Sequence, residues 1–131
     1  MKLIDISSGE LHNEASLRLT ENKYRCTLSA KACELLGLTK DNNKIRFVTT
    51  ENTPGRLYVC ATKRRTGIPV NVSTKDRKAG YIHSKKLYKL LAGKLQGPGL
   101  YRICEEDTIT DDYDGTVCYG IFFRNLQSTN N

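Results

Sequence analysis

The sequence has no long hydrophobic segment. None of its apolar runs approaches the ~18 residues that a membrane-spanning helix needs. Near the N-terminus, charged residues interrupt the apolar stretch of residues 1–6, and no small-residue cleavage site follows, so we do not expect a secretory signal. These features favour a cytoplasmic protein with no membrane partner.

The cysteines lack the spacing of a disulfide framework or a zinc site. They are odd in number, and no two form a Cys-x-x-Cys pair. Most lie in or beside apolar, strand-like segments, where a reduced thiol behaves as a small hydrophobic group. We therefore expect free thiols and a reducing compartment. The five cysteines are Cys26, Cys33, Cys60, Cys104 and Cys118.

Motifs for catalysis or cofactor binding are also lacking. Neither His12 nor His83 belongs to a pattern of nucleophile, base and acid that would suggest a catalytic triad. Residues 112–115 resemble part of a calcium loop, but Thr110 and Ile121 occupy its first and twelfth positions, where acids are needed. No phosphate-binding glycine loop precedes a helix. We expect no enzyme activity, no cofactor and no metal.

The charge of the chain is unevenly distributed. The formal net charge is +7, and residues 63–102 hold eleven Lys or Arg residues against one acid, Asp76. Residues 105–114 then hold six acids and no base. A basic field of this kind attracts polyanions, of which nucleic acid is the usual one. An evenly solvated basic surface is the alternative interpretation.

Residues 16–62 are predicted to form two hairpins joined by a short helix. Alternating polar and apolar residues predict the strands. Ala32, Leu35 and Leu36 form one apolar stripe of the helix, which Ser29 caps and Gly37 ends. In chain order the predicted elements are strands 16–20 and 24–28, helix 31–36, and strands 44–49 and 56–61.

The same order is predicted again in residues 70–125. Ser84 is the second helix cap, and the leucines of that helix are expected to face the core. Asp114-Gly115 is a strong turn pair, so the acidic residues 105–115 are predicted to form a long hairpin loop. The predicted elements are strands 70–73 and 80–83, helix 85–91, and strands 100–104 and 116–124.

A nearly fixed offset relates the two halves. Past the helices, Arg46 aligns with Arg102 at an offset of 56 residues. In and around the helices the offset is 55, and it relates Ser29, Lys31, Leu35 and Leu36 to Ser84, Lys86, Leu90 and Leu91. We interpret this as a duplication. The predicted organisation is an N-terminal extension (1–15), a first ββαββ repeat (16–62), a basic linker (63–69), a second ββαββ repeat (70–125) and a polar tail (126–131).

Residues 27–38, Thr-Leu-Ser-Ala-Lys-Ala-Cys-Glu-Leu-Leu-Gly-Leu, resemble the central segment of AbrB-type swapped-hairpin DNA-binding domains. Two such units in one chain are similar to the tandem arrangement of MraZ regulators. The resemblance implies a pseudo-symmetric barrel of interleaved hairpins that binds duplex DNA. It also implies that Arg25, just before the second strand, faces the DNA, whereas the second repeat has Gly80 at that position.

The resulting hypothesis is a mainly β barrel with two short helices that binds double-stranded DNA and regulates transcription. A homo-oligomer is compatible with this hypothesis. One alternative is a protein-interaction module that uses the acidic segment 105–114, and another is a binder of single-stranded nucleic acid or RNA. The predicted nucleic-acid-binding residues are Arg25, Lys63, Arg64, Arg65, Lys75, Arg77, Lys78, Lys85, Lys86 and Lys89.

Overall fold

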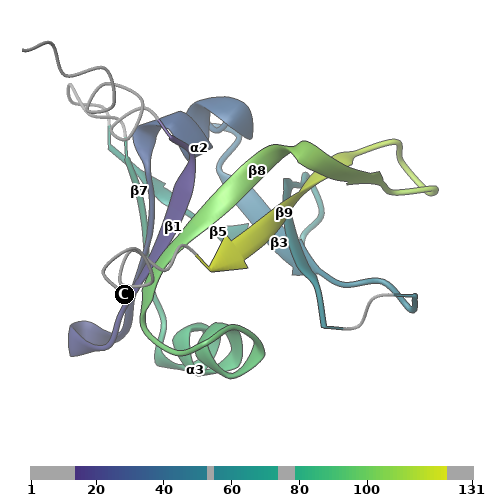
Figure 1. Cartoon of the computed structure of the whole chain (residues 1–131). Helices are drawn as coiled ribbons and strands as arrows, with labels where there is room; N and C mark the ends of the chain where they lie inside the picture. Colours follow the sequence, from purple (N-terminus) through teal and green to yellow (C-terminus); the bar gives the residue numbers. More distant parts are fainter. Residues whose placement is uncertain (1–13, 53–54, 74–78, 124–131) are drawn as a thin grey trace, which may run out of the picture.

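One antiparallel sheet of nine strands dominates the part of the chain that the computed structural model describes, which is residues 14–52, 55–73 and 79–123. The strand order is β5-β3-β4-β9-β8-β1-β2-β7-β6, and the sheet curls into a nearly closed barrel (Figure 1). The prediction of a mainly β barrel with two short helices is thereby confirmed.

The first predicted repeat forms close to its expected bounds. Ser29 caps the helix as predicted, because its Oγ accepts a hydrogen bond from the backbone N–H of Ala32 at 3.1 Å. The same Oγ accepts another from the N–H of Ser16 at 3.0 Å, which ties the helix to the first strand. The elements are β1 (Ser16–Thr20), η1 (Asn22–Tyr24), β2 (Arg25–Leu28), α2 (Ala30–Leu35), β3 (Lys44–Val48) and β4 (Leu57–Ala61).

Two short strands, the first of them within the predicted linker 63–69, take the place of the expected strand 70–73. Residues 74–78 lie outside the described residues, as do residues 1–13 and the predicted tail 126–131. The elements are β5 (Ile68–Pro69), β6 (Asn71–Val72), β7 (Gly80–His83), α3 (Lys85–Lys94), β8 (Gly99–Thr110) and β9 (Val117–Phe123).

The prediction of a long acidic loop at 105–115 was wrong. Strand β8 continues to Thr110, and its far end pairs with the start of β9, so that only the turn around Asp111–Thr116 is left. The register of this pairing shifts between Cys104 and Thr108, and the acidic residues in between lie in this irregular stretch. Local composition suggested a loop, but the ladder with β9 satisfies the backbone of this segment.

Strand pairing joins the two halves of the sequence at four places. Strand β1 pairs with β8, β2 with β7, β3 with β5, and β4 with β9. Their inward-facing side chains form one main core, in which Leu17, Leu28 and Ile45 from the first half pack with Leu91 and Tyr101 from the second. Because the halves share their ladders and their core, we expect them to fold together.

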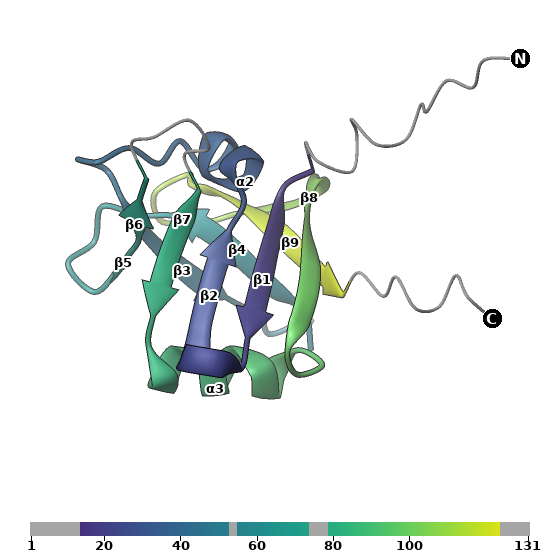
Figure 2. The same cartoon turned by 90° about the vertical axis from the view of Figure 1, so that its left-hand side faces the viewer.

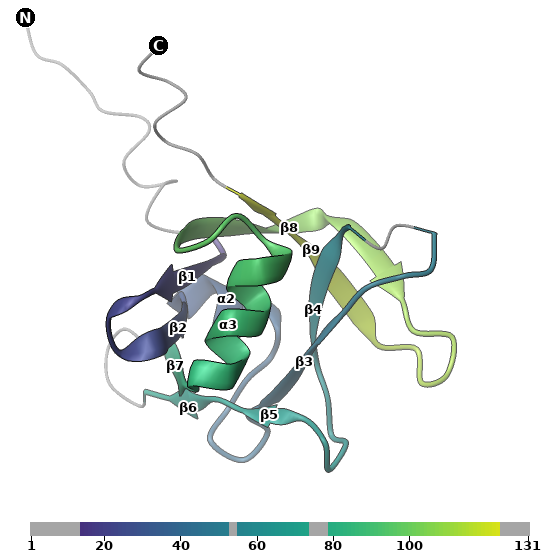
Figure 3. The same ribbon diagram turned by 90° about the horizontal axis from the view of Figure 1, so that it is seen from below.

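The helices close opposite ends of the barrel. Figure 2 places α2 at one end and α3 at the other, and Figure 3 looks along the barrel onto α3, which crosses its opening. In the described part of the chain, no helix has the length and apolar character to cross a membrane. The longest, α3, has 10 residues.

One predicted core residue of α3 is exposed. Leu87 and Leu91 are buried as expected, but Leu90 is 56% exposed. The buried stripe of α3 consists of Leu87, Tyr88 and Leu91, so the aromatic ring of Tyr88 occupies the place that the leucine spacing suggested for Leu90. The prediction that Leu90 faces the core was therefore wrong.

The repeat offset also fails in the strand before each helix. It aligns Leu28 with His83, yet Leu28 is buried while His83 is exposed. Strand side chains alternate between the two faces, so a shift of one residue turns the whole strand over. The buried face of β7 is formed by Gly80 and Ile82, and a Cβ on Gly80 would lie 2.6 Å from Cγ1 of Val70. Tight packing therefore explains why this position lacks a side chain.

Candidate nucleic-acid interface

The outer face of β1, β2 and β7 carries basic, aromatic and hydroxyl side chains. Alternation along β1 and β2 buries leucine and cysteine and turns Arg18, Arg25 and Thr27 outward. In β7 the outward residues are Tyr81 and His83. We call this surface, together with Lys85 at the start of α3, the open face.

Strand register brings the members of the open face together. Thr27 lies opposite Arg18 on one side and opposite Tyr81 on the other. Arg25 lies opposite His83. Directly opposed side chains in a sheet have their Cβ atoms about 4.5–5.5 Å apart, so these residues are neighbours.

Arg25 lies over an aromatic ring. Its guanidinium carbon is 5.7 Å from the centroid of the Tyr81 ring, a distance at which a cation and a ring attract each other. Among the described residues, no carboxylate forms an ion pair with Arg25 or Arg18. The two guanidinium groups therefore keep donors for an anionic ligand.

The first turn of α3 adds Lys85 to this surface. The Lys85 Nζ is 5.4 Å from the centroid of the Tyr24 ring, and this ring meets Tyr88 edge-on at 5.5 Å. Ser84 caps the helix as predicted, accepting a hydrogen bond from the N–H of Leu87 at 3.1 Å. Because Ser84 directly follows β7, the cap places the start of α3 beside the strand end that carries His83.

The structure describes seven of the ten predicted binding residues and divides them into two groups. Arg25 and Lys85 belong to the open face, and Lys86 and Lys89 are exposed on α3. The other three follow β4: Lys63 lies near Lys44 of β3, Arg64 lies near the turn between β8 and β9, and Arg65 is exposed. The remaining three predicted residues, Lys75, Arg77 and Lys78, lie outside the described residues.

In the linker, Arg64 forms ion pairs with the turn around Asp111–Thr116, which we call the acidic turn. Arg64 forms ion pairs with Asp111 at 3.5 Å and with Asp114 at 3.7 Å, and its guanidinium carbon is 6.0 Å from the Tyr113 ring. Arg46 of β3 also pairs with Asp111 and donates a hydrogen bond to it. These contacts offset the positive charge of Arg64, one of the three basic residues at the start of the linker.

A second ion pair lies further along β8. Asp107, within the irregular stretch of that strand, pairs with Arg56, whose guanidinium carbon also lies 4.3 Å from the centroid of the Phe122 ring. Gly120 makes room for this carboxylate, because a Cβ at that position would collide with Asp107. We call this surface of β3, β4, β8 and β9, with its three paired arginines, the paired face.

Hydrogen bonds hold the acidic turn in its charged form. The pKa of Asp111 lies below its ordinary value because its carboxylate accepts a hydrogen bond from the backbone N–H of Tyr113 and another from Arg46. The pKa of Asp114 is also lowered, by hydrogen bonds from the hydroxyl and the N–H of Thr116. Both carboxylates are therefore fully ionised at neutral pH.

The cysteines contribute to packing rather than to a reactive site. All five are free thiols, and all but Cys104 are buried. Burial raises the pKa of Cys26 and of Cys33 to about 11. Burial, and then a hydrogen bond with Cys60, raise the pKa of Cys118 to about 12. Thiols that stay protonated at neutral pH are poor nucleophiles.

Sequence reasoning had identified Arg25 and Lys85 but had missed Arg18 and His83 as parts of the same surface. Arg18 could have been found from the alternation of residues 16–20, which places it on the polar side of its strand. The repeat offset aligns His83 with Leu28, and only the register of β7 shows that His83 faces outward.

No group of three or more His, Cys, Asp or Glu side chains in the described segments is arranged to hold a metal ion. Comparisons with protein-family models, with curated proteins and with solved structures find no match to this chain. The resemblance to AbrB-type domains therefore stays a prediction, and the open face is the strongest candidate site that the geometry offers.

Proposed function

We propose that this protein is a binding module rather than an enzyme, and that it binds duplex DNA through the open face. The observation that carries the proposal is the pair of arginines Arg18 and Arg25. Neither forms an ion pair among the described residues, whereas Arg46, Arg56 and Arg64 all do. Arginine and lysine contacts to phosphates supply much of the affinity of proteins for DNA.

The surroundings of the two arginines suit a polyanion. Thr27 lies opposite Arg18 and Thr20 lies opposite Arg25 in the ladder of β1 with β2, and their hydroxyl groups can donate to phosphate oxygens. Two acids border the surface: Glu14, which pairs with Arg102 at 3.0 Å, and Glu21 in the turn before β2. Positive charge therefore exceeds negative charge across the open face.

Strand pairing supports an AbrB-like origin for this binding surface. Two ladders, β2 with β7 and β4 with β9, join strands at equivalent places in the two proposed repeats. The ladder of β1 with β8 has its counterpart in that of β3 with β5, where β5 and β6 together take the place of β1. Interleaved hairpins would produce this arrangement. On this basis we further propose a role in transcription regulation in the cytoplasm.

Binding of single-stranded nucleic acid is a second candidate, and Tyr81 favours it. This tyrosine lies partly exposed on a sheet face beside Arg25. Aromatic rings on such a face can stack with unpaired bases. The acidic segment offers less support for a protein partner there, because Asp107, Asp111 and Asp114 are already paired with arginines of the chain itself.

Fluorescence anisotropy with labelled oligonucleotides over a salt series tests the proposal. For duplex binding, log K should fall with log salt with a slope of roughly −0.9 per phosphate contact. Duplex competitor should displace the labelled probe better than a single strand of the same sequence. The reverse preference, with loss of binding in Tyr81→Ala, would select the single-stranded alternative.

Variants locate the interface. The double change Lys85→Ala and Lys89→Ala should weaken binding to all duplexes and make the salt slope shallower by about one unit per lost contact. Arg25→Ala should weaken binding to preferred sequences more than to random ones if this side chain reads bases. Lys94→Ala, on the other flank of α3, is the matched control. Equal losses in all three would contradict the assignment to the open face.

Substitutions at the other predicted binding residues complete the test. The double change Arg77→Ala and Lys78→Ala tests two predicted residues of the second repeat, and Lys63→Ala tests the linker. Replacing Glu105 and Glu106 should leave duplex affinity unchanged or slightly higher. If the basic substitutions have no effect and loss of Glu105 and Glu106 abolishes capture of a protein partner, the chain is an interaction module instead.

A further inference from the structure

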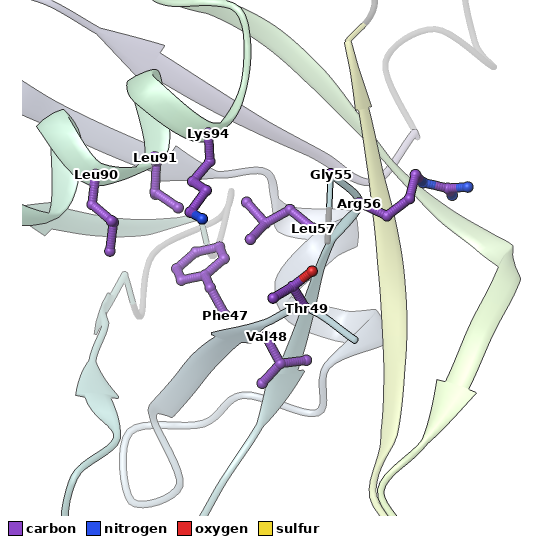
Figure 4. A pocket seen from close by; sticks show the side chains of 9 residues that line it. All are labelled: Phe47, Val48, Thr49, Gly55, Arg56, Leu57, Leu90, Leu91 and Lys94. Atoms are coloured by element: carbon purple, nitrogen blue, oxygen red, sulfur yellow. The ribbon is translucent and has the colours of Figure 1, made fainter. Parts of the chain in front are cut away.

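An apolar groove lies between α3 and the hairpin of β3 and β4. Figure 3 shows this hairpin on the side of α3 away from β1 and β2. Figure 4 shows how side chains from both elements point into it. It lies at the end of the barrel that α3 covers. Its main lining residues are Phe47, Val48, Leu57, Leu90, Leu91 and Lys94.

Leu90 is the feature of the groove that folding does not explain. It is 56% exposed, although Leu87 and Leu91 beside it in α3 are buried. Phe47, on the opposite wall, is only partly buried. Apolar side chains that stay exposed across an open groove contribute little to the stability of the fold. Clusters of such side chains commonly mark binding surfaces.

The size of the groove indicates the kind of group that fits. Its cavity measures about 110 Å³. Pockets for drug-sized ligands and cofactors span about 300–1,000 Å³, whereas an engineered cavity of about 150 Å³ accepts benzene. The groove can therefore hold a single branched aliphatic side chain, and it is too small for a cofactor.

The charge of the groove lining indicates what kind of partner carries that side chain. The groove is lined by two basic residues, Arg56 and Lys94, and by no carboxylate. Arg56 already pairs with Asp107, and its side chain points away from the cavity in Figure 4. Lys94 points from α3 toward Phe47. No ion pair of Lys94 occurs within the described residues, and α3 contains no acid. An anionic partner is therefore complementary to this rim.

We propose that this groove binds an acidic peptide segment of a partner protein, with one apolar side chain of that segment in the cavity and its carboxylates against Lys94. The proposal is independent of the duplex-binding proposal, because Lys94 and Lys85 lie on opposite flanks of α3. The protein would then hold nucleic acid on one side of this helix and an acidic segment on the other.

A labelled synthetic peptide provides the test. The probe is a short peptide of glutamate and aspartate around one central leucine, and the comparison peptide has serine in place of leucine. Anisotropy with the full chain should detect the leucine peptide at least about tenfold more tightly than the serine peptide, a ratio equivalent to about 1.4 kcal/mol. Equal binding of the two peptides, or no binding of either, would overturn the proposal.

Exposed positions supply variants that keep the fold. Leu90→Ser and Lys94→Glu should each weaken binding of the leucine peptide about tenfold or more. Lys85→Glu makes the same charge change on the opposite flank and should leave peptide affinity within about twofold. Equal weakening by Lys85→Glu and Lys94→Glu would reveal general electrostatic attraction and refute a built site.

Two further measurements would reveal a different occupant of the groove. Sedimentation equilibrium of the wild-type chain should give a monomer at peptide-binding concentrations. A dimer that Leu90→Ser dissociates would make a second copy of the chain the occupant. If Lys94→Glu weakens duplex binding as much as Lys85→Glu does while the peptide fails to bind, the groove belongs to the nucleic-acid surface. Either result contradicts the proposal.

Discussion

The paired face and the open face use the same residue type in different ways. On the paired face, Arg46, Arg56 and Arg64 all bind carboxylates that β8 and its turn deliver. On the open face, Arg18 and Arg25 have no ion-pair partner among the described residues, and Arg25 lies over a tyrosine. Both faces are built from strands of both halves of the sequence.

The two faces differ because the acidic residues of segment 105–114 lie on only one of them. Residues 105–114 look like a separate negative segment in the sequence, but the pairing of β8 with β9 carries them onto the surface that holds the basic linker. Attraction between them lowers the net potential there. The open face receives no such segment, so Arg18, Arg25 and Lys85 form no ion pair among the described residues.

The strongest test of this comparison separates the halves of the chain. Residues 1–62 and 66–131, expressed alone, should each be unfolded or form obligate dimers, because the ladders β1–β8, β2–β7 and β4–β9 and the shared core are lost. Circular dichroism and analytical ultracentrifugation measure this. Two stable monomeric halves would show that each face does not need both repeats.

A reciprocal pair of substitutions compares the faces directly. Arg18→Ala should weaken duplex binding about tenfold, the effect of one lost phosphate contact, and leave the thermal midpoint unchanged. Arg46→Ala should lower the thermal midpoint, because it leaves Asp111 with one arginine partner fewer, and should change duplex affinity by less than about threefold. Anisotropy and thermal unfolding provide the two readouts. The comparison fails if Arg46→Ala weakens binding as much as Arg18→Ala.

Two glycines test packing beneath the faces. Gly80→Ala should destabilise the protein by about 1–3 kcal/mol, because its Cβ would meet the buried Cγ1 of Val70 at 2.6 Å and the Sγ of Cys33 at 3.0 Å. Gly120→Ala should cost less, about 0–1 kcal/mol, because the carboxylate of Asp107 can swing into solvent and loses only a surface ion pair. Chemical denaturation measures both, with Gly93→Ala as a control that has open space. A larger cost for Gly120→Ala would mean that the Asp107 pair is structurally essential.

The smallest expected effect is a pH dependence confined to the paired face. The pKa values of Asp111 and Asp114 are lowered in the folded state, so their stabilisation is complete above the ordinary value of 3.8 and is lost as pH falls through the folded-state values. The double change Asp111→Asn and Asp114→Asn should reduce this acid-induced loss in urea titrations below about pH 4. An unchanged acid profile would assign the effect to other carboxylates.

Much of the local structure could be predicted from the sequence. Alternation located most of the strands, and Ser29 and Ser84 were recognised as helix caps because a serine hydroxyl satisfies the free N–H groups at a helix start. Of the open face, Arg25 and Lys85 were identified in advance. These features depend on residues within a few positions of one another, which is the range that sequence patterns describe.

Tertiary structure alone decided which charges remain available and which way each strand faces. Leu90 follows the leucine spacing of a core residue yet lies exposed, because Tyr88 fills the core beside it. His83 faces outward because β7 pairs with β2 one residue out of step with the repeat. Arg64 is neutralised by acids about 50 residues away in the chain. The sequence by itself determined most of the elements and the two helix caps, but the register of paired strands, the continuation of β8 and the meeting of distant charges depend on contacts that no local pattern encodes.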